Sequence, residues 1–177
     1  LTNETDLIAL QGKYAISIVE EMMPIPDKFT TSKDSIYTYA RTGYTGEDGV
    51  EVMLDQKDTL EFIQKLEDKG VKPCGLGSRD TLRLEASLPL YGFELTDYIT
   101  PVEAGLKWTL TNKSDYMGKA EIDKQLNSKE HKYLKRFSLN AKHIARTGTT
   151  CKSGDSKFSD LVFIKSNFGA DDFILLG

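Results

Sequence analysis

One short stretch constrains the fold of this chain more than any other: residues 50–55, in which three apolar residues occur at every second position. A strand points successive side chains to opposite faces, so Val50, Val52 and Leu54 are expected to lie together on one face. The residues that alternate with them, Glu51, Met53 and Asp55, then fall on the other face. The pattern predicts a strand with one apolar face.

The rest of the first 110 residues predicts helices that alternate with strands. The segment after residues 50–55, residues 58–69, has the spacing of an amphipathic helix that ends at Gly70. Its predicted inner face consists of Leu60, Ile63 and Leu66. A second helix is predicted from the N-cap residue Ser78 to Leu88. The remaining predicted elements are strands over residues 6–11 and 35–41 and a helix over residues 14–23. This alternation indicates an α+β domain over residues 1–110.

The pattern changes after residue 110. Residues 112–127 predict a loop and a short helix, and strand-like alternation resumes at Tyr133. Residues 147–158 are rich in Gly, Thr and Ser, and the apolar run in "DDFILL" needs a partner strand. We therefore expect residues 111–177 to contain a linker and the beginning of a separate all-β domain.

Composition excludes several classes of protein. The net charge of −4 is small and the basic residues are scattered, so residues 129–136, the most basic stretch, predict a solvated face rather than a nucleic-acid site. No apolar run approaches the roughly 18 residues that cross a bilayer, and no signal peptide is visible. Cys74, Cys151, His131 and His143 show no metal-site spacing. We expect no nucleic acid, membrane or metal, and a reducing compartment.

Three charged residues stand out. Glu51 lies in the middle of a predicted strand, where it either faces solvent or meets a ligand. Arg79 lies in the first turn of a predicted helix, where the helix dipole disfavours a cation. Arg83 follows on the same face, a second unfavourable placement. An acidic group is therefore expected nearby: an internal partner such as Asp80 or Glu85, a ligand oxygen, or Glu51 itself.

Two glycine-rich segments, residues 43–49 and 75–77, have two interpretations. They are either simple turns or places where the backbone approaches a flat ligand. Neither segment matches a phosphate-binding loop, so nucleotide hydrolysis is not expected. The two histidines of the chain do not combine with a nucleophile and an acid into a catalytic triad.

Five segments resemble those of a known family in order and spacing: "LIALQG" at residues 7–12, "ARTGYTGEDGVEV" at 40–52, "CGLGSRDTLRLEASLPLYG" at 74–92, "TPVEAGLKWTL" at 100–110 and "YMGKAEI" at 116–122. The family is that of the aminomethyltransferases, the T-proteins of the glycine cleavage system. The resemblance implies a folate-binding aminomethyltransferase fold, part of a three-domain cloverleaf. It also implies that residues 111–177 hold a linker and an incomplete C-terminal β-barrel domain.

The resemblance further implies a reaction and a site. The aminomethyl carbon on the lipoyl arm of a partner H-protein would move to tetrahydrofolate, the co-substrate, with release of ammonia and without a metal. Glu51 would grip the pterin's 2-amino and ring N–H groups, Arg79 would be the cationic partner in the same pocket, and Tyr44 would pack against or hydrogen-bond the folate. Trp108 is a weaker candidate, because a lone Trp in an apolar stretch is usually a core residue.

The chain also departs from the family pattern. The family's acidic residue near the reacting folate nitrogens is expected upstream of Leu1, so no catalytic residue is predicted here and this chain alone is expected to be inactive. Lys13 stands where the family usually has a proline, and the resemblance becomes thin beyond Ser153. The alternatives are a folate-dependent demethylase, a non-catalytic folate-binding or docking module, and an interaction domain without a ligand. The expected compartment is the bacterial cytoplasm or, in a eukaryote, the mitochondrial matrix.

Overall fold

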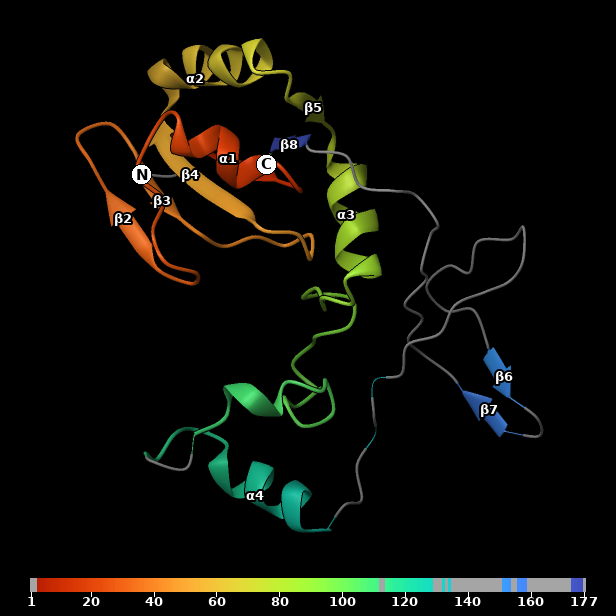
Figure 1. Ribbon diagram of the computed structural model, residues 1–177. Coiled ribbons are helices and arrows are strands. Elements are labelled where there is room, and N and C mark those ends of the chain that lie inside the picture. Colours follow the sequence, from red (N-terminus) through yellow and green to blue (C-terminus); the bar gives the residue numbers. More distant parts are fainter. Residues whose placement is uncertain are drawn as a thin grey trace. The chain divides into compact units, whose positions relative to one another are not determined.

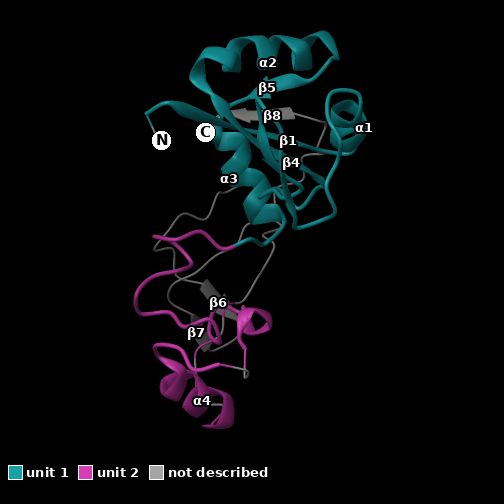
Figure 2. Ribbon diagram, turned by 90° about the vertical axis from the view of Figure 1, so that its left-hand side faces the viewer, with its two compact units in different colours: residues 1–88, 166–177 teal, residues 89–165 magenta. Residues whose placement is uncertain are grey.

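The structure is a computed structural model that describes residues 3–111, 114–128, 132, 134, 151–153, 156–158 and 173–176 (Figure 1). Contacts between residues divide the chain into two compact units, one of Leu1–Leu88 with Ser166–Gly177 and one of Pro89–Lys165 (Figure 2). The predicted division into a folate-binding portion over residues 1–110 and a linker with an incomplete β-barrel domain over residues 111–177 stays a prediction.

The first unit is built on a six-stranded sheet in the order β2-β3-β4-β1-β8-β5. Its strands are β1 (Thr5–Gln11), β2 (Thr31–Lys33), β3 (Thr38–Ala40), β4 (Gly49–Asp55), β5 (Lys72–Cys74) and β8 (Phe173–Leu176). Neighbouring strands are antiparallel, except that β5 and β8 are parallel. With its helices, this sheet confirms the predicted α+β class. The apolar run near the C-terminus finds its partner strands here, as β8 between β1 and β5.

The main core lies on one face of this sheet. Val50, Val52 and Leu54 of β4 are buried on it, as the alternation predicts. Two helices supply the other side of the same buried cluster: α1 (Ala15–Glu20) and α2 (Gln56–Asp68). On the opposite face, Ala9 of β1 forms a second cluster with Leu82 of α3 (Leu76–Glu85). The sheet is therefore covered on both faces, and α3 is the helix on the face of Ala9.

The predicted inner face of α2 is partly wrong. Leu60 is 81% exposed, whereas Thr59, Phe62 and Leu66 are buried. The helix is seated so that Phe62 enters the core, and Thr59 donates a hydrogen bond to an aspartate of β1. The predicted end of the helix is confirmed, because Gly70 has a φ of +84°, a left-handed conformation that favours glycine.

The predicted start of α3 is also wrong. The helix begins at Leu76 with Gly75 as its N-cap, and the Ser78 N–H already donates to the Gly75 carbonyl. The helix ends at Glu85 rather than at Leu88. Ser87 adopts a φ of 61°, a left-handed conformation that stops an α-helix.

The predicted strand over residues 35–41 is shorter in the structure. The Asp34 carboxylate accepts hydrogen bonds from the backbone N–H groups of Ile36 and Tyr37, 2.7 Å each, and so forms a turn before β3 begins. The turn connects β3 to β2, a strand that the sequence pattern does not predict.

In the second unit, the described elements are η1 (Lys107–Thr109), α4 (Lys119–Ser128) and a two-stranded sheet of β6 (Cys151–Ser153) and β7 (Ser156–Phe158). Val102, Ala104 and Ile122 are buried in this unit. Most of the strand predicted from Tyr133 onward lies outside the described residues. Across the described residues of both units, no helix has the length and apolar character of a membrane span.

Candidate functional site

Two of the predicted site residues meet. Tyr44 lies in the loop between β3 and β4, and Arg79 lies in the first turn of α3. The guanidinium carbon of Arg79 is 5.2 Å from the centroid of the Tyr44 ring, a cation–π contact between two half-buried side chains. Within the part of the chain that the structure describes, Arg79 makes no ion pair with a carboxylate. The aromatic ring therefore takes the place of the acidic partner expected for Arg79.

Glu51, the third predicted residue, lies in β4 on the face that α3 covers. Its cross-strand partners are Ala9 of β1 and Ala40 of β3, and Ala9 packs against α3. Its carboxylate is half-buried and accepts a hydrogen bond from Thr42 Oγ1 at 2.6 Å. Glu51 and Arg79 thus belong to the same side of the sheet, but no direct ion pair joins them among the described residues.

Arg83, which shares the helix with Arg79, has an internal partner. Its side chain is almost completely buried and binds Asp80 Oδ1 at 2.8 Å. Arg83 Nη1 also donates to the Leu88 carbonyl at 3.4 Å. Asp80 was one of the predicted internal partners, and its pairing with Arg83 offsets the repulsion between the two arginines.

A buried glutamine that sequence reasoning missed anchors the loop that carries Tyr44. Gln11, at the end of β1, is fully buried. Its Nε2 donates to the carbonyls of Thr42, at 3.0 Å, and Val50, at 3.3 Å. Its Oε1 accepts from Thr45 Oγ1 at 3.3 Å. The one sequence signal for a buried Gln11 was its position at the end of an apolar strand. A polar residue at that position is more often exposed.

The first glycine-rich segment is needed for packing within the protein. A Cβ at Gly43 would lie 1.8 Å from the side-chain oxygen of Gln11. Gly46 has a φ of +83°, and a Cβ there would lie 2.6 Å from the Cβ of Ala86. The loop therefore packs closely against β1 and the end of α3. This packing accounts for its glycines without a ligand. No atom lies within 4 Å of a Cβ placed at Gly75 or Gly77.

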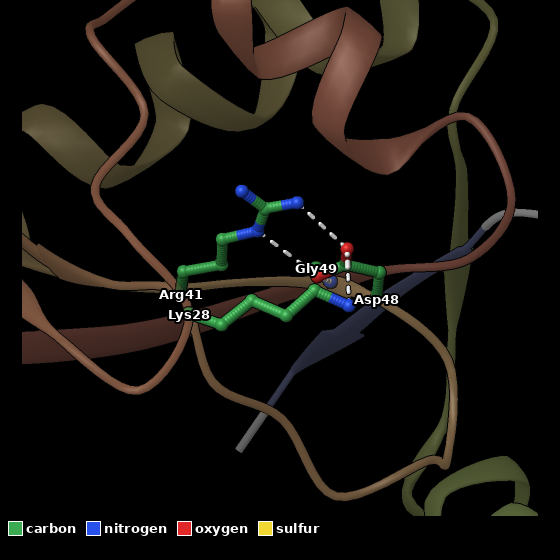
Figure 3. A network of polar contacts seen from close by, with 4 residues as sticks. All are labelled: Lys28, Arg41, Asp48 and Gly49. Atoms are coloured by element: carbon green, nitrogen blue, oxygen red, sulfur yellow. Dashed lines mark hydrogen bonds and ion pairs between the residues drawn. The ribbon is translucent and has the colours of Figure 1, made fainter.

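An ionic cluster at the base of the same loop was also missed (Figure 3). Arg41 donates to both carboxylate oxygens of Asp48, at 3.2 and 2.8 Å, and Lys28 Nζ lies 3.1 Å from Asp48 Oδ2. The Gly49 N–H donates to the same carboxylate at 3.0 Å. The Arg41 hydrogen bond is the main cause that lowers the pKa of Asp48 to about 2. The cluster joins the two ends of the glycine-rich loop.

The remaining candidates are placed elsewhere. Trp108 is 82% exposed, so its interpretation as a core residue is wrong. Cys74 is a half-buried free thiol whose pKa is raised by burial. Across the described ranges, His, Cys, Asp and Glu side chains form no group of three that could hold a metal ion.

Comparisons with known proteins agree with the resemblance. Residues 1–114 match the family model described as the GCVT N-terminal domain. An aminomethyltransferase from Synechocystis sp. is 42% identical over 159 residues, which cover 82% of this chain and 42% of that protein. One from Xanthomonas axonopodis pv. citri is 44% identical over 159 residues, covering 81% of this chain and 43% of that protein.

A solved structure extends the agreement to the fold. The crystal structure of glycine cleavage system aminomethyltransferase T from Bartonella henselae matches with a TM-score of 0.64 and 32% identity, covering 70% of this chain and 37% of that chain. The chain thus spans less than half the length of these relatives. The family model, the relatives and the solved structure together establish that this chain belongs to the GCVT aminomethyltransferase family.

Proposed function

We propose that this chain is the folate-binding part of a tetrahydrofolate-dependent aminomethyltransferase of the glycine cleavage system. The observation that carries the proposal is the contact of Arg79 with Tyr44, on the side of the sheet where Glu51 presents its carboxylate. These are the residues expected to bind folate from the resemblance. They come from a loop, a helix and a strand, and in the folded chain they lie on one side of the same sheet.

The chemistry of the three side chains suits a pterin. A carboxylate offers two acceptor oxygens, so Glu51 would accept from the adjacent 2-amino and ring N–H groups. The flat Tyr44 ring would pack against the folate. Arg79, oriented by that ring, would direct its N–H donors at a ligand oxygen.

The proposed reaction moves one carbon. Tetrahydrofolate N5 attacks the aminomethyl carbon carried on the lipoyl arm of H-protein, ammonia leaves, and 5,10-methylenetetrahydrofolate and the dihydrolipoyl arm result. The contribution of this chain is to hold the folate in line with the arm, which turns an encounter of two molecules into a reaction within one complex. No residue of this chain is proposed as the catalytic acid or base. The proposed compartment is the bacterial cytoplasm or, in a eukaryote, the mitochondrial matrix.

Calorimetry of tetrahydrofolate binding to the complete protein and to its Glu51→Ala variant tests the site. We expect the variant to lose about 1–3 kcal/mol of binding free energy, the scale of an unpaired buried polar group. The matched control is Asp55→Asn, since Asp55 is an exposed carboxylate four residues further along the same strand. Equal affinity in wild type and Glu51→Ala would refute the proposed site.

A transfer assay separates an enzyme from a binding module. The complete protein is mixed with aminomethylated H-protein and tetrahydrofolate, and ammonia release is followed. Folate binding without ammonia release would identify a non-catalytic module. Carbon transfer from a methylated amine instead of H-protein would identify a demethylase.

A further inference from the structure

The Glu51 carboxylate is held by a residue outside the predicted site. Thr42 Oγ1 donates to Glu51 Oε2 at 2.6 Å, a short distance typical of a hydrogen bond to a charged acceptor. The two residues are brought together by the register of β3 and β4, in which Ala40 pairs with Glu51. Thr42 follows the end of β3, two positions beyond Ala40, and its hydroxyl meets the Glu51 carboxylate on that face of the sheet.

Thr42 is itself fixed in place. Its backbone carbonyl accepts a hydrogen bond at 3.0 Å from Nε2 of Gln11, which is fully buried. The next residue, Gly43, has no side chain because Gln11 occupies the space where a Cβ would lie. The position of the hydroxyl is therefore determined by the core of the first unit.

This arrangement leaves most of the carboxylate free to accept from a ligand. An ionised carboxylate has about four lone-pair sites, and Thr42 uses one of them. Both oxygens can still each accept one N–H group, and the bond to Thr42 restrains rotation of the carboxylate plane. A side chain restrained before binding loses less conformational entropy when the ligand arrives.

We propose that Thr42 is a positioning residue that orients Glu51 for two adjacent N–H donors of the ligand. The inference rests on the proposed function, in which that ligand is the pterin of tetrahydrofolate. Thr42 does not touch the ligand in this proposal, and it acts only through Glu51.

The test is tetrahydrofolate affinity of the complete protein carrying Thr42→Val, which removes the hydroxyl and keeps the shape. We expect binding to weaken about tenfold, as for loss of one hydrogen bond to a charged group. Thr42→Ser restores the hydroxyl and is expected to bind within about threefold of wild type. The control is Thr38→Val in β3, a residue without a hydrogen bond to Glu51, and it should leave affinity unchanged.

A double-mutant cycle shows whether Thr42 acts through Glu51. We expect the Thr42→Val/Glu51→Ala double variant to bind no more weakly than Glu51→Ala alone, because the hydroxyl then has nothing to orient. A purely structural role for Thr42 would instead make the two losses multiply, and that result would overturn the proposal. So would failure of Thr42→Ser to restore binding.

The outcomes also separate this inference from the proposed function. If Glu51→Ala weakens binding while Thr42→Val does not, positioning by Thr42 is wrong and the folate site stands. If Glu51→Ala binds as wild type does, the folate site itself is wrong. If Thr42→Val does not fold, Thr42→Ala replaces it, and the difference between Ala and Ser at this position decides the question.

Discussion

The guanidinium of Arg79 in α3 lies over the ring of Tyr44, with 5.2 Å between the guanidinium carbon and the ring centroid. The contact joins the glycine-rich loop to α3, the helix that covers the Ala9 face of the sheet. It also offsets the unfavourable placement of a cation in the first turn of a helix.

This contact predicts a measurable coupling between the two side chains. A cation–π pair near the surface contributes about 0.5–1 kcal/mol. In a cycle of Tyr44→Leu, Arg79→Met and the double variant, urea unfolding should give a coupling free energy of that size. Strictly additive losses of stability would show that the contact has no energetic role.

The Asp48 cluster predicts a pH-dependent stability. The folded pKa of Asp48 is about 2, below its ordinary value of 3.8, so its stabilising contribution is present above about pH 4 and is lost as pH falls toward 2. The Asp48 side chain is 34% exposed, so solvent screening reduces this contribution to about 1 kcal/mol.

Unfolding of wild type and Asp48→Asn, compared from pH 7 to pH 2, checks this expectation. The difference between the two proteins should be constant from pH 7 to about pH 5 and should shrink between about pH 4 and pH 2. A difference that does not change with pH would contradict the assignment of the shifted group to Asp48.

Gln11→Met is predicted to destabilise the protein by about 1–3 kcal/mol, because the Thr42 carbonyl loses its buried donor. The matched control is Gln56→Met, since Gln56 is an exposed glutamine with one weak contact at 3.4 Å, and it should change stability by no more than about 0.5 kcal/mol. Urea unfolding measures both. Equal changes in the free energy of unfolding for the two variants would mean that the buried amide of Gln11 does not stabilise the protein.

Two glycines with nearly the same φ are predicted to respond differently to alanine. Gly46 and Gly70 have φ values of +83° and +84°, so each substitution introduces backbone strain of about 1–2 kcal/mol. Only at Gly46 would the new Cβ also collide, at 2.6 Å, with Ala86. We expect Gly46→Ala to cost at least about 1 kcal/mol more than Gly70→Ala in thermal or urea unfolding.

The observed face of α2 predicts the effects of two neighbouring substitutions. Phe62→Ala should cost about 3–5 kcal/mol, because Phe62 is fully buried. Leu60→Gln should change stability by about 0.5 kcal/mol or less, because Leu60 is 81% exposed. A large loss of stability in Leu60→Gln would mean that Leu60 is buried, as the spacing predicted.

The sequence by itself determined the local features and the family. The alternation of Val50, Val52 and Leu54 predicted a buried strand face, because a period of two places all three side chains together whatever the strand's partners are. Gly70 predicted the end of α2, because the left-handed conformation there favours glycine. The motif segments predicted the family, and they also selected Tyr44 and Arg79, whose folate-binding roles stay predictions.

Only the tertiary structure decided which distant groups meet. Spacing could not decide whether Leu60 or Phe62 faces the sheet. The apolar residues of α2 form a stripe, and a small rotation of the helix about its axis changes which of them are buried. The contacts of Gln11 with Thr42, 31 residues away, and the insertion of β8 beside β1 depend on strand pairing. Thr42 met Glu51 for the same reason: the register of two strands, set by burial of one face, also determines which polar groups meet on the other.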